Sequence, residues 1–208
     1  MGRTKILDAS SEQAIAEASR VLREGGIVAF PTETFYGLGV IYNDIQALKR
    51  LYELKGRPKD KAMPVIIGDR KLLPLVASSI NSAEERISKR FWPGPVTLLM
   101  PALNDLPDFL TAGTGRVAVR VPGKSFALDL ARAIGLPVTA TSANTSGLPP
   151  ADTPRDVIEY FGDGLDLLID GGKTPGGMPS TIVQASDDGI RILRRGVISD
   201  KEILDEVR

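Results

Sequence analysis

The sequence has 208 residues, with 26 lysines and arginines balanced by 26 aspartates and glutamates and a hydrophobic fraction of 42%. This length fits one domain with a substantial core, and the balanced charge excludes a global basic field for nucleic acid. Histidine and cysteine are absent, which excludes disulfides, thiolate nucleophiles, imidazole bases and zinc sites of the Cys/His type. Any chemistry must therefore use carboxylates, lysines, arginines, hydroxyls, backbone groups or the substrate itself.

Membrane and export signals are also absent from the sequence. No apolar run approaches the ~20 residues that span a bilayer, and the N-terminal stretch MGRTKILDASSEQ lacks the apolar core of a secretory signal. We therefore expect a cytosolic protein without a membrane-spanning segment.

Helical and strand patterns alternate along the whole chain. Ser10 and Gln13 predict a capping box that opens the first helix. The apolar run Ile27-Val28-Ala29-Phe30, stopped by Pro31, predicts a buried strand. Further strands are expected over 65–67, 96–100, 117–120, 138–141 and 167–170, and further helices over 43–55, 70–77, 82–91, 125–134 and 153–161.

The C-terminal part predicts a hairpin and a last helix. Strands over 181–184 and 190–193 flank the turn sequence Asp187-Asp188-Gly189, and Ser199 with Glu202 predicts a capping box for a helix over 199–208. Strands and helices interleave without repeats or low-complexity linkers. These patterns favour one α/β domain over residues 1–208, in which helices cover a central sheet.

The segment after the first strand is rich in hydroxyls and glycines. It contains Thr32, Thr34, Tyr36, Gly37 and Gly39. Small residues let a ligand come close to the backbone, and hydroxyls can hydrogen-bond it. We expect a ligand-binding loop here.

A second loop carries alternating cations, which suit a phosphate chain. The cations are Lys55, Arg57, Lys59 and Lys61, beside Pro58. Neither GxxxxGK[ST] nor GxGxxG occurs in the sequence, so side-chain cations would have to hold any phosphate. We predict that the two loops form one pocket for a nucleotide and a small polar molecule.

Three other features allow more than one interpretation. Arg120 and Arg194 end predicted strands, where ligands gather in open α/β sheets, but a single arginine is more often a surface charge. The segment 141–147, TSANTSG, offers hydroxyls and an amide to phosphate or sugar oxygens, and the same residues are ordinary in turns. The glycine-rich stretch 171–179 fits either a lid over a site or a connection between strands.

Carboxylates and aromatic residues give weaker signals. Glu33 and Asp170 are candidates to hold Mg²⁺ through water, but neither has a ligand partner at a suitable spacing. Phe91 and Trp92 fit core positions better than a base-stacking platform.

Seven segments of the chain resemble, in order, the threonylcarbamoyl-AMP synthases, the YrdC-like family. The segments are FPTETFYGLG, LKGRPKDKAMPVII, WPGPVTLLM, VAVRVP, TSANTSG, PSTIV and ILRRG. They run from about Ile27 to Gly196, nearly the whole chain, and seven in order are a specific signal. The chain resembles the single-domain form of the family.

The resemblance implies a fold and an activity. The fold would be a single domain with a twisted open mixed sheet flanked by helices, a concave basic cavity, a core over about 11–196 and a C-terminal helix over 199–208. The enzyme, a nucleotidyltransferase, would form threonylcarbamoyl-AMP and pyrophosphate from L-threonine, bicarbonate and ATP, with Mg²⁺ accompanying ATP. Downstream tRNA-modifying proteins would transfer the threonylcarbamoyl group to tRNA, and direct tRNA binding is left open.

The resemblance also assigns roles by position, and it assigns no metal ligand to the protein. Catalysis would use Lys55 and Arg57. Threonine would contact Thr34, Arg120, Ala140 and Ser180. ATP would contact Lys55, Arg57, Lys61, Thr141, Ser142, Asn144, Pro150 and Arg194.

Three positions depart from the family pattern. Ile66 stands where some members have a histidine, Arg116 where many have a threonine, and Arg195 where many have a proline. None of these changes removes a residue that the resemblance assigns to the site.

Two other functions compete with the synthase. One is a non-catalytic module that binds tRNA or double-stranded RNA, although the zero net charge counts against it. The other is a nucleotide-binding regulator without turnover.

Overall fold

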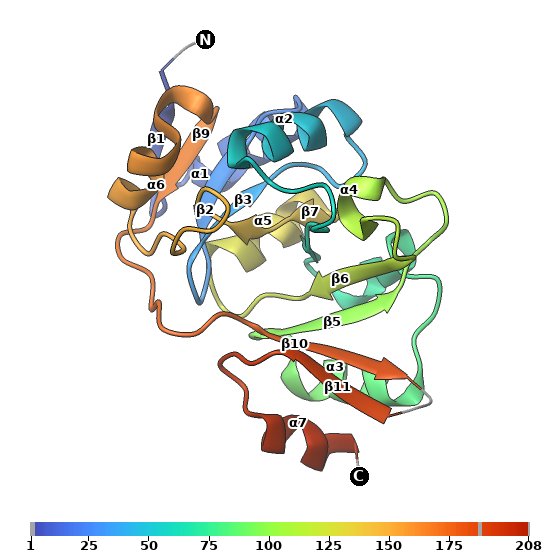
Figure 1. Ribbon diagram of the computed structural model, residues 1–208. Coiled ribbons are helices and arrows are strands. Elements are labelled where there is room, and N and C mark those ends of the chain that lie inside the picture. The colour runs from blue at the N-terminus through green and yellow to red at the C-terminus, as the bar shows by residue number, and fades with distance from the viewer. Residues whose placement is uncertain (1–2, 187–188, 208) are drawn as a thin grey trace.

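The structure is a computed structural model, and it describes residues 3–186 and 189–207. Two mixed β-sheets lie one above the other, with helices packed around them (Figure 1). The first sheet has the order β1-β9-β2-β3-β8, with bounds Lys5–Asp8, Leu167–Asp170, Val28–Pro31, Tyr36–Gly39 and Thr141–Ser142. The second has the order β11-β10-β5-β6-β4-β7, with bounds Gly189–Arg194, Thr181–Ser186, Val96–Pro101, Arg116–Arg120, Val65–Ile66 and Val138–Thr139.

The expected single central sheet is thus wrong, because one predicted strand divides between two sheets. Residues 138–141 supply β7, which pairs with β4 of the second sheet, and the start of β8, which pairs with β3 of the first. Between them, Ala140 donates its backbone N–H to the carbonyl of Pro64 at 3.0 Å. The chain passes from one sheet to the other at Ala140. The fold class holds: it is a single α/β domain with open mixed sheets.

Helices cover both sheets. Helices α1 and α5 pack against each other and against strands of the first sheet, whereas α3 packs against the second sheet and α7 packs against α3 (Figure 1). Among the described residues, no helix is long and apolar enough to cross a bilayer. The α-helices are α1 (Ala14–Arg23), α2 (Ile45–Lys55), α3 (Ser82–Phe91), α4 (Asp108–Thr111), α5 (Phe126–Ile134), α6 (Pro154–Phe161) and α7 (Asp200–Val207), and 3₁₀ turns cover Arg70–Leu75 and Gly162–Gly164.

Burial on both faces explains why the sequence of β2 is apolar without alternation. Ala29 belongs to a core cluster that joins both sheets, and Phe30 belongs to a second cluster beneath α1 and α5. Because a strand points successive side chains to opposite faces, a strand that is buried on both faces must be apolar throughout. The strand prediction at this segment is confirmed.

Most predicted helix starts are confirmed, but the first is wrong. Asp8 Oδ1 accepts hydrogen bonds from the backbone N–H and the hydroxyl of Ser10, at 2.7 and 2.6 Å. This contact holds the residues after β1 in turns, so α1 begins only at Ala14, and Gln13 as N-cap makes no side-chain cap bond. The local bond to Asp8 outcompetes the capping box.

The C-terminal hairpin and helix form as predicted. Strands β10 and β11 pair antiparallel, and the predicted turn residues Asp187 and Asp188 lie outside the described residues. Ser199 Oγ accepts the N–H of Glu202 at 3.3 Å, while Glu202 Oε2 accepts the N–H of Ser199 at 3.0 Å. The last position of the expected helix, 208, also lies outside the described part.

The glycine-rich segment expected as a loop is partly a strand. Residues Tyr36–Gly39 form β3, which pairs antiparallel with β2. A Cβ on Gly39 would lie 2.7 Å from Phe30 Cε1 and 2.9 Å from the carbonyl oxygen of Thr139. Gly39 is therefore required by packing, because β3 lies close to the backbone at Thr139 there. The open loop is limited to residues 32–35.

The substitution Gly39→Ala tests this close approach. We expect it to lower the free energy of unfolding by about 3 kcal/mol, because the added carbon meets a ring and a backbone oxygen that cannot both retreat. Gly113→Ala serves as the control, since a Cβ there meets no atom within 4 Å and costs only about 1 kcal/mol of left-handed backbone strain. Urea denaturation measures both values. Equal losses for the two variants would contradict the packing role of Gly39.

Candidate functional site

A cavity of about 230 Å³ opens between the two sheets. Its lining comes from both sheets and from the segments that connect them, so residues far apart in sequence meet there. Among the described residues, its lining includes three arginines and no aspartate or glutamate. The lining residues are Thr32, Thr34, Phe35, Tyr36, Gly37, Arg57, Ala62, Pro64, Val65, Ile66, Thr97, Ala118, Arg120, Ala140, Thr141, Ser142, Pro179, Ser180, Ile182 and Arg194.

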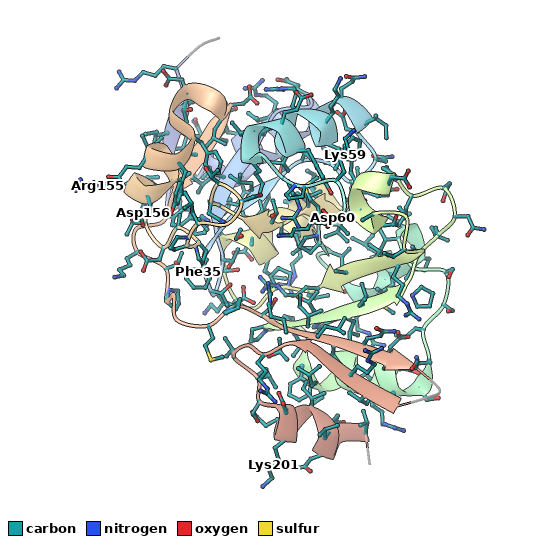
Figure 2. All side chains as sticks on the ribbon, in the orientation of Figure 1. Phe35, Lys59, Asp60, Arg155, Asp156 and Lys201 are labelled. Carbon is teal, nitrogen blue, oxygen red and sulfur yellow. The ribbon has the colours of Figure 1, made fainter. Side chains whose placement is uncertain are left out.

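The loop 32–35 forms one wall of the cavity and is held by its own hydroxyls. Thr32 Oγ1 accepts the N–H of Thr34 at 3.0 Å and donates to the carbonyl of Phe35 at 2.8 Å. Thr34 in turn accepts the N–H of Gly176 on its carbonyl, at 2.8 Å. Phe35 lies between the upper and lower halves of the molecule (Figure 2). The buried Thr34 hydroxyl is thereby placed on the cavity wall.

The glycine-rich stretch 171–179 is tied to this wall, which favours the connection over the lid. The Tyr36 hydroxyl accepts the N–H of Gly171 at 3.0 Å and donates to the carbonyl of Gly172 at 2.8 Å. Burial raises the pKa of Tyr36 to about 12, so the phenol stays protonated. The stretch joins β9 of the first sheet to β10 of the second (Figure 1).

Arg120 projects from the end of β6 and is nearly buried. Its Nη2 lies 3.2 Å from Glu33 Oε2, and Glu33 Oε1 also accepts the N–H of Gly123 at 2.8 Å. Burial lowers the pKa of Arg120, and the Glu33 carboxylate opposes this shift. A guanidinium in such a place favours a carboxylate partner, and in this structure the protein's own Glu33 is that partner.

Arg194, Ser180 and Thr97 form a second polar group on the cavity wall. Arg194 Nη2 donates to the Ser180 carbonyl at 2.8 Å and to its Oγ at 2.9 Å. The Thr97 hydroxyl lies 2.9 Å from Ser180 Oγ. Burial lowers the pKa of Arg194, and the neighbouring Arg120 lowers it further. Two desolvated cations that repel each other favour an anion between or beside them.

Arg57 lies where the cation-rich loop meets the cavity. Its Nε donates to the Lys61 carbonyl at 2.8 Å, and its Nη2 to the Ala62 carbonyl at 2.7 Å. Its Nη1 is 3.5 Å from Thr141 Oγ1, and burial lowers its pKa. The carbonyls of its own loop therefore orient the guanidinium toward Thr141 of β8.

Lys55 is placed differently, although it stands only two residues before Arg57. Its side chain is buried, with 1% of the residue exposed, and its Nζ donates to the carbonyls of Ser142 and Asn144. Asn144 uses its own Nδ2 to bind the carbonyls of Thr145 and Leu148, at 2.9 and 2.8 Å. Both residues therefore bind backbone behind the cavity wall.

The structure brings eight of the twelve residues assigned by resemblance to one cavity. These are Thr34, Arg57, Arg120, Ala140, Thr141, Ser142, Ser180 and Arg194. The other four, Lys55, Lys61, Asn144 and Pro150, do not line it. This arrangement is consistent with the expected single pocket, because Thr34 of the hydroxyl-rich loop and Arg57 of the loop with alternating cations both line the cavity.

Sequence reasoning missed Thr97, which lines the cavity from β5. Val96 and Leu98 on either side of it belong to the core, so the alternation of a strand turns Thr97 to the opposite face. That alternation was the available signal, because a hydroxyl between two core positions of a strand must find a polar partner.

The three departures from the family pattern occupy different surroundings. Ile66 lines the cavity and makes its wall apolar there. Arg116 lies on the same strand as Arg120 but outside the cavity lining. Arg195 is exposed and pairs with Asp200 at 3.0 Å, so it points away from the cavity.

The carboxylates do not form a metal centre within the residues that the structure describes. Glu33 is paired with Arg120, and Asp170 Oδ1 accepts the N–H of Gly172 at 2.9 Å. No group of three or more acidic residues suited to a metal ion occurs in residues 3–186 and 189–207. The aromatic candidates serve the core: Trp92 is buried and its Nε1 donates to the carbonyl of Val96 at 2.6 Å.

The sequence belongs to a defined family. The Sua5/YciO/YrdC family model, described as "Telomere recombination", matches residues 20–196. The chain is therefore a member of the Sua5/YciO/YrdC family.

Several curated relatives carry the name threonylcarbamoyl-AMP synthase. The one from Pyrococcus abyssi is 40% identical over 92% of this chain, and the one from Bacillus subtilis is 40% identical over 93%. The chain spans 56% of the length of each of these two. A relative from an Enterobacter species is 37% identical, over 83% of this chain and 91% of its own length.

Several solved structures share the fold of this chain. P. abyssi Sua5 complexed with L-threonine has a TM-score of 0.90 and 37% identity, over 99% of this chain and 61% of that one. The MTH1692 protein of Methanobacterium thermoautotrophicum has a TM-score of 0.69 and 35% identity, over 94% of this chain and 93% of that one. Escherichia coli YciO, at 24% identity and a TM-score of 0.85 over 98% of this chain and 100% of that one, shares the fold.

The substitution Glu33→Gln tests the buried ion pair of the cavity. We expect the free energy of unfolding to fall by about 2 kcal/mol or more, because Arg120 is left with an uncompensated charge. Inorganic phosphate should restore part of this loss by supplying an anion to the cavity.

The control for this measurement is Glu85→Gln, which removes a carboxylate that pairs with Lys89 on the surface of α3. This variant should leave the unfolding midpoint nearly unchanged, with or without phosphate, because exposed pairs contribute little. If the two variants lost the same stability, Glu33 would not compensate Arg120.

Proposed function

We propose that this protein is an L-threonylcarbamoyladenylate synthase that joins L-threonine, bicarbonate and ATP. The observation that carries the proposal is the convergence of Arg57, Arg120 and Arg194 on one cavity whose lining also holds hydroxyls. Such a cavity suits an amino-acid carboxylate and a polyphosphate together. The name threonylcarbamoyl-AMP synthase of the relatives and the threonine complex of the P. abyssi protein support threonine as a substrate.

The proposed reaction has two steps. The amine of threonine forms a bond to the carbon of CO₂ derived from bicarbonate, giving a carbamate and releasing water. A carbamate oxygen then attacks the α-phosphorus of ATP, and the bond between that phosphorus and the bridging oxygen breaks to release pyrophosphate. The second step brings anions together, so the protein contributes mainly positioning and charge neutralisation. Neither step needs an imidazole or a thiolate.

Threonine is proposed to bind at the Arg120 end of the cavity. Its carboxylate would take the place beside Arg120 that Glu33 now fills at 3.2 Å. The hydroxyls of Thr34 and Ser180 line the same cavity and are available to the threonine amine and hydroxyl. The backbone of Ala140, where the chain changes sheets, completes this end.

ATP is proposed to bind toward Arg57, Arg194 and the short strand β8. Thr141 and Ser142 of β8 line the cavity and carry hydroxyls. Arg57 is the proposed catalytic cation, because its guanidinium can neutralise charge as pyrophosphate leaves. ATP would enter as its Mg²⁺ complex, with its phosphates supplying metal ligands, since the described residues contain no group of three or more acidic residues suited to hold a metal ion.

Further partners follow from the proposed product. Threonylcarbamoyl-AMP is an activated acyl adenylate, so a separate tRNA-modifying protein would have to accept the threonylcarbamoyl group. Because ATP and tRNA meet in the cytosol, we propose a cytosolic location.

The deciding assay measures pyrophosphate release from ATP with threonine and bicarbonate both present and with each omitted. A synthase requires both. Binding of tRNA or double-stranded RNA without pyrophosphate release would favour the RNA-binding module, and ATP binding without release would favour a regulator. Either of these outcomes would overturn the proposal.

The variant Arg57→Met should lower the rate of pyrophosphate release about 10²-fold or more, because one charge-stabilising contact in the transition state is lost. Arg155→Met is the control, since Arg155 extends from α6 away from the body of the molecule (Figure 2) and should keep the normal rate. A folded Arg57→Met protein with normal turnover would contradict the catalytic role of Arg57.

The variant Arg120→Lys should raise the KM for threonine about tenfold or more, because lysine keeps the charge but loses the two-pronged geometry that matches a carboxylate. The KM for ATP should change much less. Arg116→Lys, on the same strand but outside the cavity lining, provides the matched control. An effect confined to the KM for ATP would place the threonine carboxylate elsewhere.

A further inference from the structure

Lys55 binds one short turn with both its side chain and its backbone. Its Nζ donates to the carbonyls of Ser142 and Asn144, at 2.5 and 2.6 Å. Its own carbonyl accepts the N–H of Ser146 at 3.0 Å. All three contacts fall on residues 142–146, which we call the Ser142 turn, although 87 and 89 residues of sequence separate Lys55 from the first two partners.

The surroundings of Lys55 bury its ammonium outside the lining of the cavity. The residue is 1% exposed and does not line the cavity, and its Nζ lies 6.0 Å from the centroid of the Phe161 ring. Backbone carbonyls accept two of its three N–H groups, and the burial of the side chain separates the third from solvent. Arg57, two residues later, lines the cavity instead.

The electrostatics of Lys55 agree with a closed site. Burial, and to a lesser extent the charge of Arg57, lower the pKa of Lys55 to about 7. A buried ammonium with two short acceptors is a structural cross-link and is costly to remove.

The turn that Lys55 holds presents a side chain to the cavity. Asn144 closes the turn from within, since its Nδ2 binds the carbonyls of Thr145 and Leu148 and its Oδ1 accepts the Ser142 hydroxyl at 2.5 Å. Ser142 is the exposed member of this group and lines the cavity. The position of its hydroxyl therefore depends on what anchors the turn.

We infer that Lys55 is a positioning residue, which anchors the Ser142 turn against the end of α2 and makes no contact with the ATP phosphates. This role replaces the direct phosphate contact that the resemblance implies for Lys55. This inference rests on the proposed function only in taking ATP as the ligand near the turn. The contacts between Lys55 and the turn are present without any ligand.

The first test uses the unmodified protein and an amine-reactive label, with the modified lysines located by mass spectrometry. Lys49 is the internal reference, since it lies on the same helix with 63% of its side chain exposed. Lys55 should react at least about tenfold more slowly than Lys49 because it is buried, and MgATP should not change its rate. A fast reaction of Lys55 that MgATP suppresses would overturn the inference.

The second test follows amide hydrogen exchange of the Ser142 turn in Lys55→Met without any ligand, with Lys49→Met as the control. Exchange of the turn should accelerate about tenfold or more in Lys55→Met, because local opening no longer breaks the lysine contacts. In Lys49→Met it should stay at the normal rate. Unchanged exchange in a folded Lys55→Met protein would show that the turn does not depend on Lys55.

A double-mutant cycle then connects the anchor to catalysis. If Lys55 acts through Ser142, the losses in kcat/KM for ATP from Lys55→Met and Ser142→Ala should be strongly non-additive, whereas two separate ligand contacts would add. Additive losses would overturn the inference. If the unmodified protein released no pyrophosphate, the proposed function would fail, and labelling and exchange would still decide the role of Lys55.

Discussion

The passage of the chain between two sheets at Ala140 is the constraint on which the site depends. Buried backbone groups must find partners wherever a strand leaves its sheet. Here the N–H of Thr139 binds the Val40 carbonyl at 2.9 Å, and the N–H of Ala140 binds the Pro64 carbonyl at 3.0 Å. Thr139 Oγ1 also accepts the N–H of Val40 at 3.0 Å. The N–H groups of both residues at the crossing are thereby satisfied, and the two sheets stay apart with a cavity between them.

The crossing also explains how a protein of zero net charge has a basic cavity. Strand ends from both sheets meet at the gap, and three of them or their adjoining loops carry Arg57, Arg120 and Arg194. Surface acids elsewhere balance the total charge. Burial lowers the pKa of all three arginines, so the cavity holds poorly solvated cations, of which Arg120 is paired with Glu33. An anionic ligand would neutralise these buried cations. Function therefore depends on how charge is distributed, and the net charge does not reveal it.

Local signals in the sequence predicted most elements correctly, because they depend on neighbours along the chain. The cap at Asp44, where Oδ1 accepts the N–H of Ala47 at 3.0 Å, is one example. The division of residues 138–141 was beyond such signals, since both halves share one strand pattern and only their partners differ. The start of α1 was missed for a similar reason, because Asp8 belongs to a strand that the apolar pattern did not reveal.

Candidate site residues were predictable as a group but not in orientation. The motif that contains Lys55 and Arg57 indicates two cations near a ligand, yet one faces the cavity and the other faces the backbone of a turn. The difference arises because Lys55 is the last residue of α2 and its side chain faces the carbonyls of Ser142 and Asn144. Arg57 instead follows Gly56, which has a left-handed backbone conformation. A change of backbone direction at one glycine separates their roles, and no pattern of charges records it.

An apolar wall beside the arginines gives the cavity a second kind of contact, because Ile66 pairs with Arg120 and Ile182 with Arg194 in the strand registers. Ile66 and Ile182 line the cavity from β4 and β10, where the family pattern allows a histidine at the first of these positions. Under the proposed function, arginine and hydroxyl contacts would bind the carboxylate, amine and hydroxyl that threonine and serine share, so they would not distinguish the two amino acids. Only the methyl group differs, and one methyl against an apolar wall is worth about 1 to 3 kcal/mol. Under the proposed function, preference for threonine over serine must therefore come from this wall, and its limit is the free energy of burying one methyl group.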